Sequence, residues 1–158
     1  MASWGEVASE APELAAAVEA VFDARRHKTI ATLRRDGSPR ISGIEAWFWD
    51  GQLWFGSMWR AVKALDLRRD PRFALHSGSE DPPAWKADAK VAGRVEAVGN
   101  PDAIAQVLER SETAAPPGPM HLFRAEVSEV VRTALGEPAD HLVIESWHAG
   151  RGLSSRRR

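Results

Sequence analysis

Apolar residues change their spacing several times along the chain, and each change predicts a different element. From Pro12 to Phe22 they recur three and four residues apart, which is typical of a helix with one buried face. Proline suits the first helical position because its missing N–H has no partner there anyway. We therefore predict one N-terminal helix within residues 1–26. The cations at 25–28 are assigned to its last turn, where they favour the negative end of the helix dipole.

Short β-prone runs separated by turn signals replace the helical spacing from Thr29 onward. The pairs Asp36-Gly37 and Asp50-Gly51 are strong hairpin signals, so residues 29–57 are predicted to form three antiparallel strands. The same reasoning predicts further strands at residues 72–76, 87–98, 122–133 and 141–147.

Two more helices interrupt these strands. One follows Ser57 and stops before Pro71, and the other runs from Pro101 to Arg110. Gly93, inside the long predicted strand at residues 87–98, indicates a bulge or a close backbone approach. The strands cluster instead of alternating one for one with helices, which predicts a β-rich α+β fold with antiparallel strands and two to three flanking helices. Closure into a barrel would remove the sheet edges.

Composition narrows the possible functions. The chain has 158 residues, 44% hydrophobic and 27% charged, which suits one domain spanning 1–158. The formal net charge of −1 gives no positive field that would favour nucleic acid or an anionic membrane as a partner. No leader pattern opens the chain and no stretch approaches the ~20 apolar residues of a spanning helix, so we expect a cytoplasmic location. The basic residues 151–158 are expected to form a flexible tail.

Several chemistries find no support in the residue types present. The absence of cysteine excludes a disulfide framework, a thiolate zinc site and a thiol nucleophile. No Ser-His-acid or paired-carboxylate signature supports a hydrolase, so catalytic residues stay unassigned. The histidines show no ligand spacing and no metal is expected; they are His27, His76, His121, His141 and His148.

A candidate anion pocket lies where the third predicted strand gives way to the second helix. Ser57, Arg60 and Lys63 place a hydroxyl and two cations near a helix start, and these groups neutralise a phosphate at low cost. The alternative is a solvated helix face, in which Asp66 pairs with Lys63 or Arg69 for only ~0.2–0.5 kcal/mol each. Spacing alone favours this alternative.

The stretch from Thr29 to His76 resembles the pyridoxamine 5'-phosphate oxidase-like family of split β-barrel flavin and deazaflavin proteins. The resemblance covers about a third of the chain at motif level. It implies an FMN-binding split barrel that forms a homodimer with the cofactor at the subunit interface. The motifs that carry it are Arg35-Asp36-Gly37-Ser38-Pro39, Asp50-Gly51, Leu53-Trp54-Phe55-Gly56-Ser57, Lys63-Ala64 and Leu67-Arg68-Arg69-Asp70-Pro71-Arg72.

In that family the hydroxyl residue ending the third strand and the lysine six residues later hold the cofactor phosphate. The resemblance assigns these roles to Ser57 and Lys63. The oxidases proper place an arginine directly before that lysine, where this chain has Val62, and Arg60 is our candidate to reach the phosphate instead.

The resemblance also implies that the second strand lies along the isoalloxazine ring, mainly through backbone contacts. Asp88 aligns with a glutamine of the oxidases, and residues 145–152 lack their pyridoxal phosphate motif. Both departures weigh against a true pyridoxamine phosphate oxidase. The C-terminus looks more like actinobacterial members of the wider family, which often use the deazaflavin coenzyme in place of FMN. Among the tryptophans, only Trp59 is included in the predicted cofactor site. The predicted cofactor-binding residues are Arg40, Ile41, Ser42, Gly43, Ile44, Glu45, Ser57, Met58, Trp59, Arg60, Lys63 and Asp88.

Three functions follow as hypotheses. The leading one is a flavin- or deazaflavin-dependent oxidoreductase that transfers a hydride between bound FMN, or the 8-hydroxy-5-deazaflavin coenzyme (F-420), and an unidentified small molecule. The alternative is a non-catalytic carrier of that cofactor or of a haem-like tetrapyrrole, since one fold hosts many functions. A third, a small barrel binding single-stranded nucleic acid through Trp and Arg, is opposed by the near-zero net charge.

Overall fold

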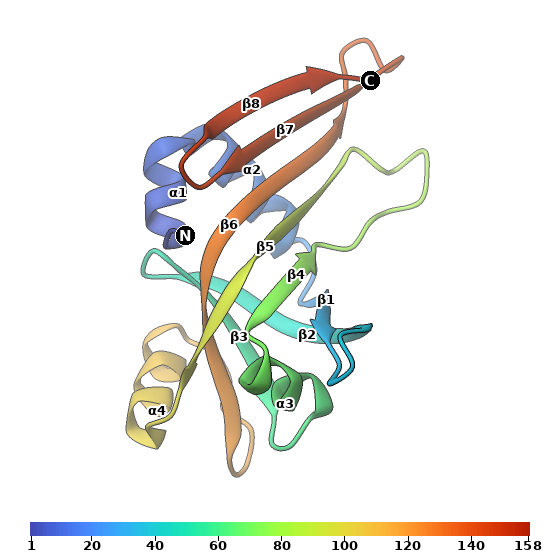
Figure 1. Ribbon diagram of the computed structural model, residues 1–158. Coiled ribbons are helices and arrows are strands. Elements are labelled where there is room, and N and C mark those ends of the chain that lie inside the picture. The colour runs from blue at the N-terminus through green and yellow to red at the C-terminus, as the bar shows by residue number, and fades with distance from the viewer.

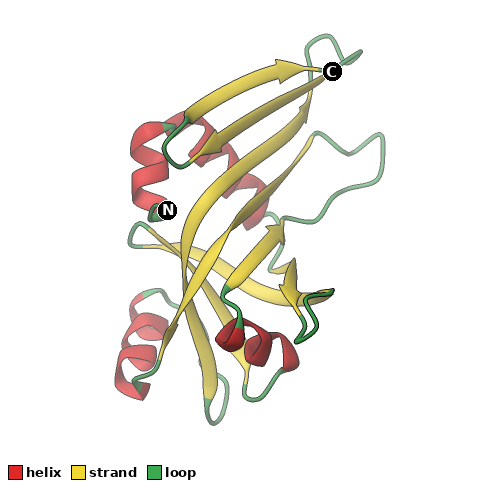
Figure 2. Ribbon diagram, viewed as in Figure 1, coloured by secondary structure: helices red, strands yellow, loops and turns green.

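The computed structural model describes residues 1–158 and contains four helices and eight strands (Figures 1 and 2). The helices are α1 (Trp4–Glu10), α2 (Pro12–Asp23), α3 (Val62–Arg69) and α4 (Pro101–Arg110). The strands are β1 (His27–Leu33), β2 (Pro39–Trp49), β3 (Gln52–Met58), β4 (Arg72–His76), β5 (Ala87–Val98), β6 (Met120–Leu135), β7 (Leu142–His148) and β8 (Gly152–Arg157).

Six of the strands close into a barrel. The order is β3-β2-β1-β4-β5-β6, and β3 pairs again with β6, so the ring has no free edge. Strand β6 is 16 residues long and continues past the barrel, where β7 and β8 pair onto it in turn. Figure 1 shows this extension at the top, with α1 and α2 beside it and α3 and α4 at the opposite end. This confirms the β-rich split-barrel prediction, with four helices in place of the expected two to three.

A β-bulge sits where the sequence predicted one. The pairing of β5 with β6 shifts between Ala92 and Gly93. A Cβ at Gly93 would overlap the carbonyl oxygen of Glu126, so the two backbones approach too closely for any side chain. The bulge lets the long β5 and β6 pair continue from the barrel into the extension.

The N-terminal region differs from the single helix that we expected within residues 1–26. It forms two helices with a break at Ala11, whose φ of −141° and ψ of 64° are not helical. Val7 and Val18 are fully buried in the core, and the break lets both helices turn their apolar faces inward. Because α2 ends at Asp23, the cations at 25–28 lie beyond its last turn.

The expected flexible tail at 151–158 is also corrected, because most of it forms strand β8. It pairs with β7 from Gly152, opposite His148, to Arg157, opposite Val143. Glycines at 150 and 152 adopt φ values of 77° and 73°, which permits the tight turn between the strands. None of the helices is both long and apolar enough to cross a bilayer.

Candidate functional site

A pocket of about 420 Å³ lies against β2 and β3, beside the start of α3. Pairing of β2 with β3 sets Glu45 opposite Gly56, so the two strands of one hairpin form one wall of the pocket. The rest of the wall comes from the end of α4 with the segment after it, and from residues at the starts of β1, α3 and β6. The lining residues are Arg26, His27, Gly43, Ile44, Glu45, Trp47, Gly56, Ser57, Met58, Lys63, Leu108, Thr113, Ala114, Ala115, Pro116 and Met120.

One corner of this pocket contains a buried hydroxyl without a partner. Ser57 is 6% exposed, and its Oγ makes no hydrogen bond. A buried polar group left unpaired costs about 1–3 kcal/mol, so such a group usually indicates a missing partner. A ligand oxygen that accepts a hydrogen bond here would satisfy Ser57.

The start of α3 adds donors and a positive charge to the same corner. The N-cap residue Ala61 offers no capping side chain, and the backbone N–H groups of Val62 and Lys63 have no backbone acceptor. The half-buried Lys63 forms no ion pair within 4.0 Å. A free hydroxyl, free helix-start N–H groups and a free cation together match an oxyanion such as a phosphate.

The surroundings of Asp66 decide between an anion site and the solvated-helix alternative. Its side chain is 4% exposed and accepts hydrogen bonds from Arg40 Nε at 2.7 Å, Arg69 Nη2 at 3.0 Å and Thr32 Oγ1 at 3.0 Å. Burial raises its pKa, but the hydrogen bonds from Arg40, Arg69 and Thr32 outweigh this, and the pKa lies below its ordinary value. The pair with Arg69 therefore exists, whereas Lys63 stays free for a ligand.

The structure brings together half of the predicted cofactor-binding residues. Those that line the pocket are Gly43, Ile44, Glu45, Ser57, Met58 and Lys63. Those that do not are Arg40, Ile41, Ser42, Trp59, Arg60 and Asp88. Whether the lining residues contact a cofactor stays a prediction.

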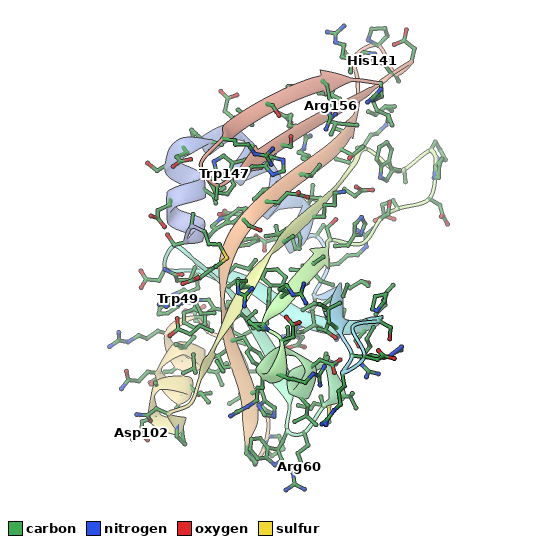
Figure 3. The ribbon with its side chains drawn as sticks, viewed as in Figure 1. Trp49, Arg60, Asp102, His141, Trp147 and Arg156 are labelled. Atoms are coloured by element: carbon green, nitrogen blue, oxygen red, sulfur yellow. The ribbon has the colours of Figure 1, made fainter.

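Three of the residues outside the pocket have other partners. The Arg40 side chain is held by Asp66. Arg60 has a φ of 59° and donates its backbone N–H to His121 Nε2 at 3.2 Å, while its side chain points away from the molecule (Figure 3). Whether it reaches a bound phosphate stays a prediction. Asp88 accepts a hydrogen bond from the Trp85 indole at 3.2 Å.

Sequence reasoning missed several pocket residues. Arg26 and His27 approach the Glu45 carboxylate at 3.7 and 3.9 Å, whereas we had assigned them to a helix terminus. Trp47 also lines the pocket, and its indole N–H is buried without a partner. Alternation along β2 could have found it, because Gly43, Glu45 and Trp47 share one face of the strand. The segment at 113–116 carries no local signal for this role.

His121 is a buried histidine whose pKa is lowered, first by burial and then by the nearby Arg68. A folded-state pKa below the ordinary 6.5 means that the unfolded chain binds the proton more readily. We therefore expect the free energy of unfolding to fall as the pH drops below about 6.5. Urea titrations between pH 7.5 and 5 measure this. The slope of the unfolding free energy against pH should be smaller in His121→Gln than in the wild type, and equal slopes in the two proteins would contradict the assignment.

Comparison with known proteins identifies the family to which this chain belongs. A model of the pyridoxamine 5'-phosphate oxidase family matches residues 14–133, and no curated protein matches the chain significantly. Similar solved structures include a pyridoxamine 5'-phosphate oxidase-related, FMN-binding protein of Nostoc punctiforme (17% identity, 90% of this chain, 94% of that chain, TM-score 0.62). Another is a conserved hypothetical protein of Mycobacterium tuberculosis (22% identity, 73% of this chain, 81% of that chain, TM-score 0.59). A third is an F420 reductase (21% identity, 71% of this chain, 94% of that chain, TM-score 0.53). At these identities the structures support the fold alone, but the family match spans most of the chain, and this protein therefore belongs to the pyridoxamine 5'-phosphate oxidase family.

Proposed function

We propose that this protein binds FMN or a deazaflavin coenzyme by its phosphate and acts as a flavin-type oxidoreductase on a small molecule. The observation that carries the proposal is the corner where the unpaired Ser57 Oγ, the unpaired Lys63 and the uncapped start of α3 meet. The names of two structural relatives, an FMN-binding protein and an F420 reductase, agree with it.

The rest of the pocket suits a flat ring system. Its volume of about 420 Å³ falls within the range of roughly 300–1,000 Å³ typical of small-molecule sites. Gly56 keeps it open, because a Cβ there would lie 3.3 Å from Met120 Cε and 3.4 Å from the Trp47 ring. Gly43 pairs with β1 but has no partner in β3, so its backbone is available to the ring. When bound, the cofactor supplies the hydride chemistry, and the protein binds and orients it.

We also propose that a second copy of the chain covers the pocket. Apolar side chains beside it are unusually exposed, with Ile41 at 74%, Met58 at 80%, Val62 at 53% and Leu65 at 47%. Exposed apolar groups gathered around a binding site are typical of an interface. A homodimer with the cofactor at the interface would cover these side chains. It would also explain why Asp88, predicted to meet the ring, lies outside the pocket of its own chain.

The decisive experiment is a titration of the purified protein with FMN and with the deazaflavin coenzyme, followed by absorption and fluorescence. We expect saturable binding of one of them, with a stoichiometry of one cofactor per chain and a molecular mass corresponding to two chains. Reduced cofactor on the protein should then be reoxidised by an added acceptor. Binding without turnover by any acceptor would favour the carrier hypothesis, and failure to bind either cofactor would overturn the proposal.

A further inference from the structure

A second pocket of about 360 Å³ adjoins the first and has no role in the proposed function. Four residues line both pockets, so the two are neighbours separated by little more than side chains: Leu108, Ala115, Pro116 and Met120. Helix α4 supplies Ile104 and Ala105, and the remaining wall comes from Trp59, Arg68 and His121.

One wall of the second pocket is a stack of flat rings. Trp59 lies parallel to His121, with ring centroids 4.7 Å apart and an interplanar angle of 13°. His121 in turn is stacked on Phe123 at 6.1 Å and 14°. The buried His121 and Phe123 hold this stack in place, while Trp59 remains 51% exposed at its outer end. A large indole fixed in position but left open offers a surface for another flat, apolar group.

The second pocket has few charged or titratable side chains, and none of them is acidic. Arg68 is exposed and makes neither an ion pair nor a side-chain hydrogen bond, and no Asp or Glu lines the pocket. His121 accepts the backbone N–H of Arg60 at Nε2, so the neutral ring carries its proton on Nδ1 and is a donor. Burial and Arg68 lower the pKa of His121, which keeps the ring neutral near pH 7. Arg68 is therefore the only formal charge in the lining, and it is positive.

We propose that the second pocket binds a flat, mostly apolar molecule carrying one anionic group, such as an aromatic carboxylate. The carboxylate pairs with Arg68, and the ring system lies against Trp59 and the aliphatic side chains of α4. A planar guanidinium is well suited to a carboxylate because it donates two parallel hydrogen bonds. This site requires no bound cofactor and so goes beyond the function proposed above.

The test uses 2-naphthoate as the probe and the neutral, equally shaped 2-naphthamide as its control. Isothermal titration calorimetry of the full chain at pH 7.5 should show saturable naphthoate binding at least about tenfold tighter than amide binding, since hydrogen bonds to charged groups contribute that much or more. No saturable binding, or equal affinity for the acid and the amide, would overturn the proposal.

Substitutions test which side chains bind the probe. Arg68→Gln should weaken naphthoate binding about tenfold and leave the amide unchanged, whereas Trp59→Leu should weaken both. Both side chains are exposed, so the fold should be retained, and near-ultraviolet circular dichroism of Arg68→Gln checks this. Arg35→Gln is the matched control, since Arg35 is exposed in the β1–β2 turn without an ion pair. It should change neither affinity. Equal losses in Arg68→Gln and Arg35→Gln would reject the site.

A competition experiment separates this proposal from the cofactor site. Saturating FMN should leave the naphthoate affinity within about twofold, because the anion partners differ. Loss of naphthoate binding in Lys63→Ala, or its displacement by FMN, would place the probe in the first pocket and overturn the proposal. If neither FMN nor the deazaflavin coenzyme binds, the proposed function fails, while the naphthoate result still stands or falls by itself.

Discussion

Replacing Lys63 with alanine is expected to weaken FMN binding by at least about tenfold and up to about a hundredfold. Hydrogen bonds to charged groups contribute about 1.5–3 kcal/mol, and each 1.4 kcal/mol is a tenfold change in the dissociation constant. Lys63 has no partner within the protein, so its whole interaction is available to the phosphate. For the same reason its removal should leave the free energy of unfolding within about 0.5 kcal/mol.

Fluorescence titration of wild-type protein and Lys63→Ala measures the loss. Lys90→Ala is the matched control, because Lys90 is exposed on β5 and lines neither pocket, so its affinity should equal that of the wild type. Lys63→Arg keeps the charge and should recover part of the affinity. Since the interaction is electrostatic, the difference between wild type and Lys63→Ala should shrink as salt increases. Equal FMN affinity in all of these proteins would remove Lys63 from the phosphate site.

The parts of the fold that the sequence predicted are those determined by short-range signals. The turns at Asp36-Gly37 and Asp50-Gly51 define β1 to β3, and Gly93 marks the bulge between β5 and β6. The break at Ala11 was missed because alanine is not a capping residue and gives no sign of a helix boundary. Strand β8 was missed because it is short, basic and lacks alternation, and only its pairing with β7 orders it.

The candidate site likewise has parts that depend on short-range signals and parts that depend on the closed barrel. Ser57 and Lys63 could be predicted together because both lie within one strand-to-helix junction, and both line the pocket. The wall at 113–116 depends on closure of the barrel between β3 and β6, which no local pattern encodes. Asp66 shows most clearly where prediction from the sequence ends. Its spacing from Lys63 suggested a surface ion pair, whereas the fold turns it inward to Arg40, 26 residues away.

Replacing Asp66 with alanine is expected to cost about 3–5 kcal/mol of the free energy of unfolding. The change leaves Arg40 and Arg69 without their shared anion in a partly buried site, and breaking a buried ion pair by removing one partner has a cost of this size. For a chain of this length that corresponds to a decrease in Tm of roughly 10 °C. Urea denaturation measures the change. Asp70→Ala is the matched control, because Asp70 pairs only with the exposed Arg72 and its loss should cost clearly less.

Acid should reduce the difference between wild type and Asp66→Ala. The folded-state pKa of Asp66 lies below the ordinary 3.8, so its contribution is complete above that pH and is lost as the pH falls through the lowered value. The two unfolding free energies should therefore begin to approach each other as the pH falls below about 3.8. Because Asp66 also fixes α3 to β1 and β2, folded Asp66→Ala should bind FMN more weakly even though it retains Ser57 and Lys63. A difference in stability that persists unchanged at low pH would show that Asp66 acts through packing rather than through its charge.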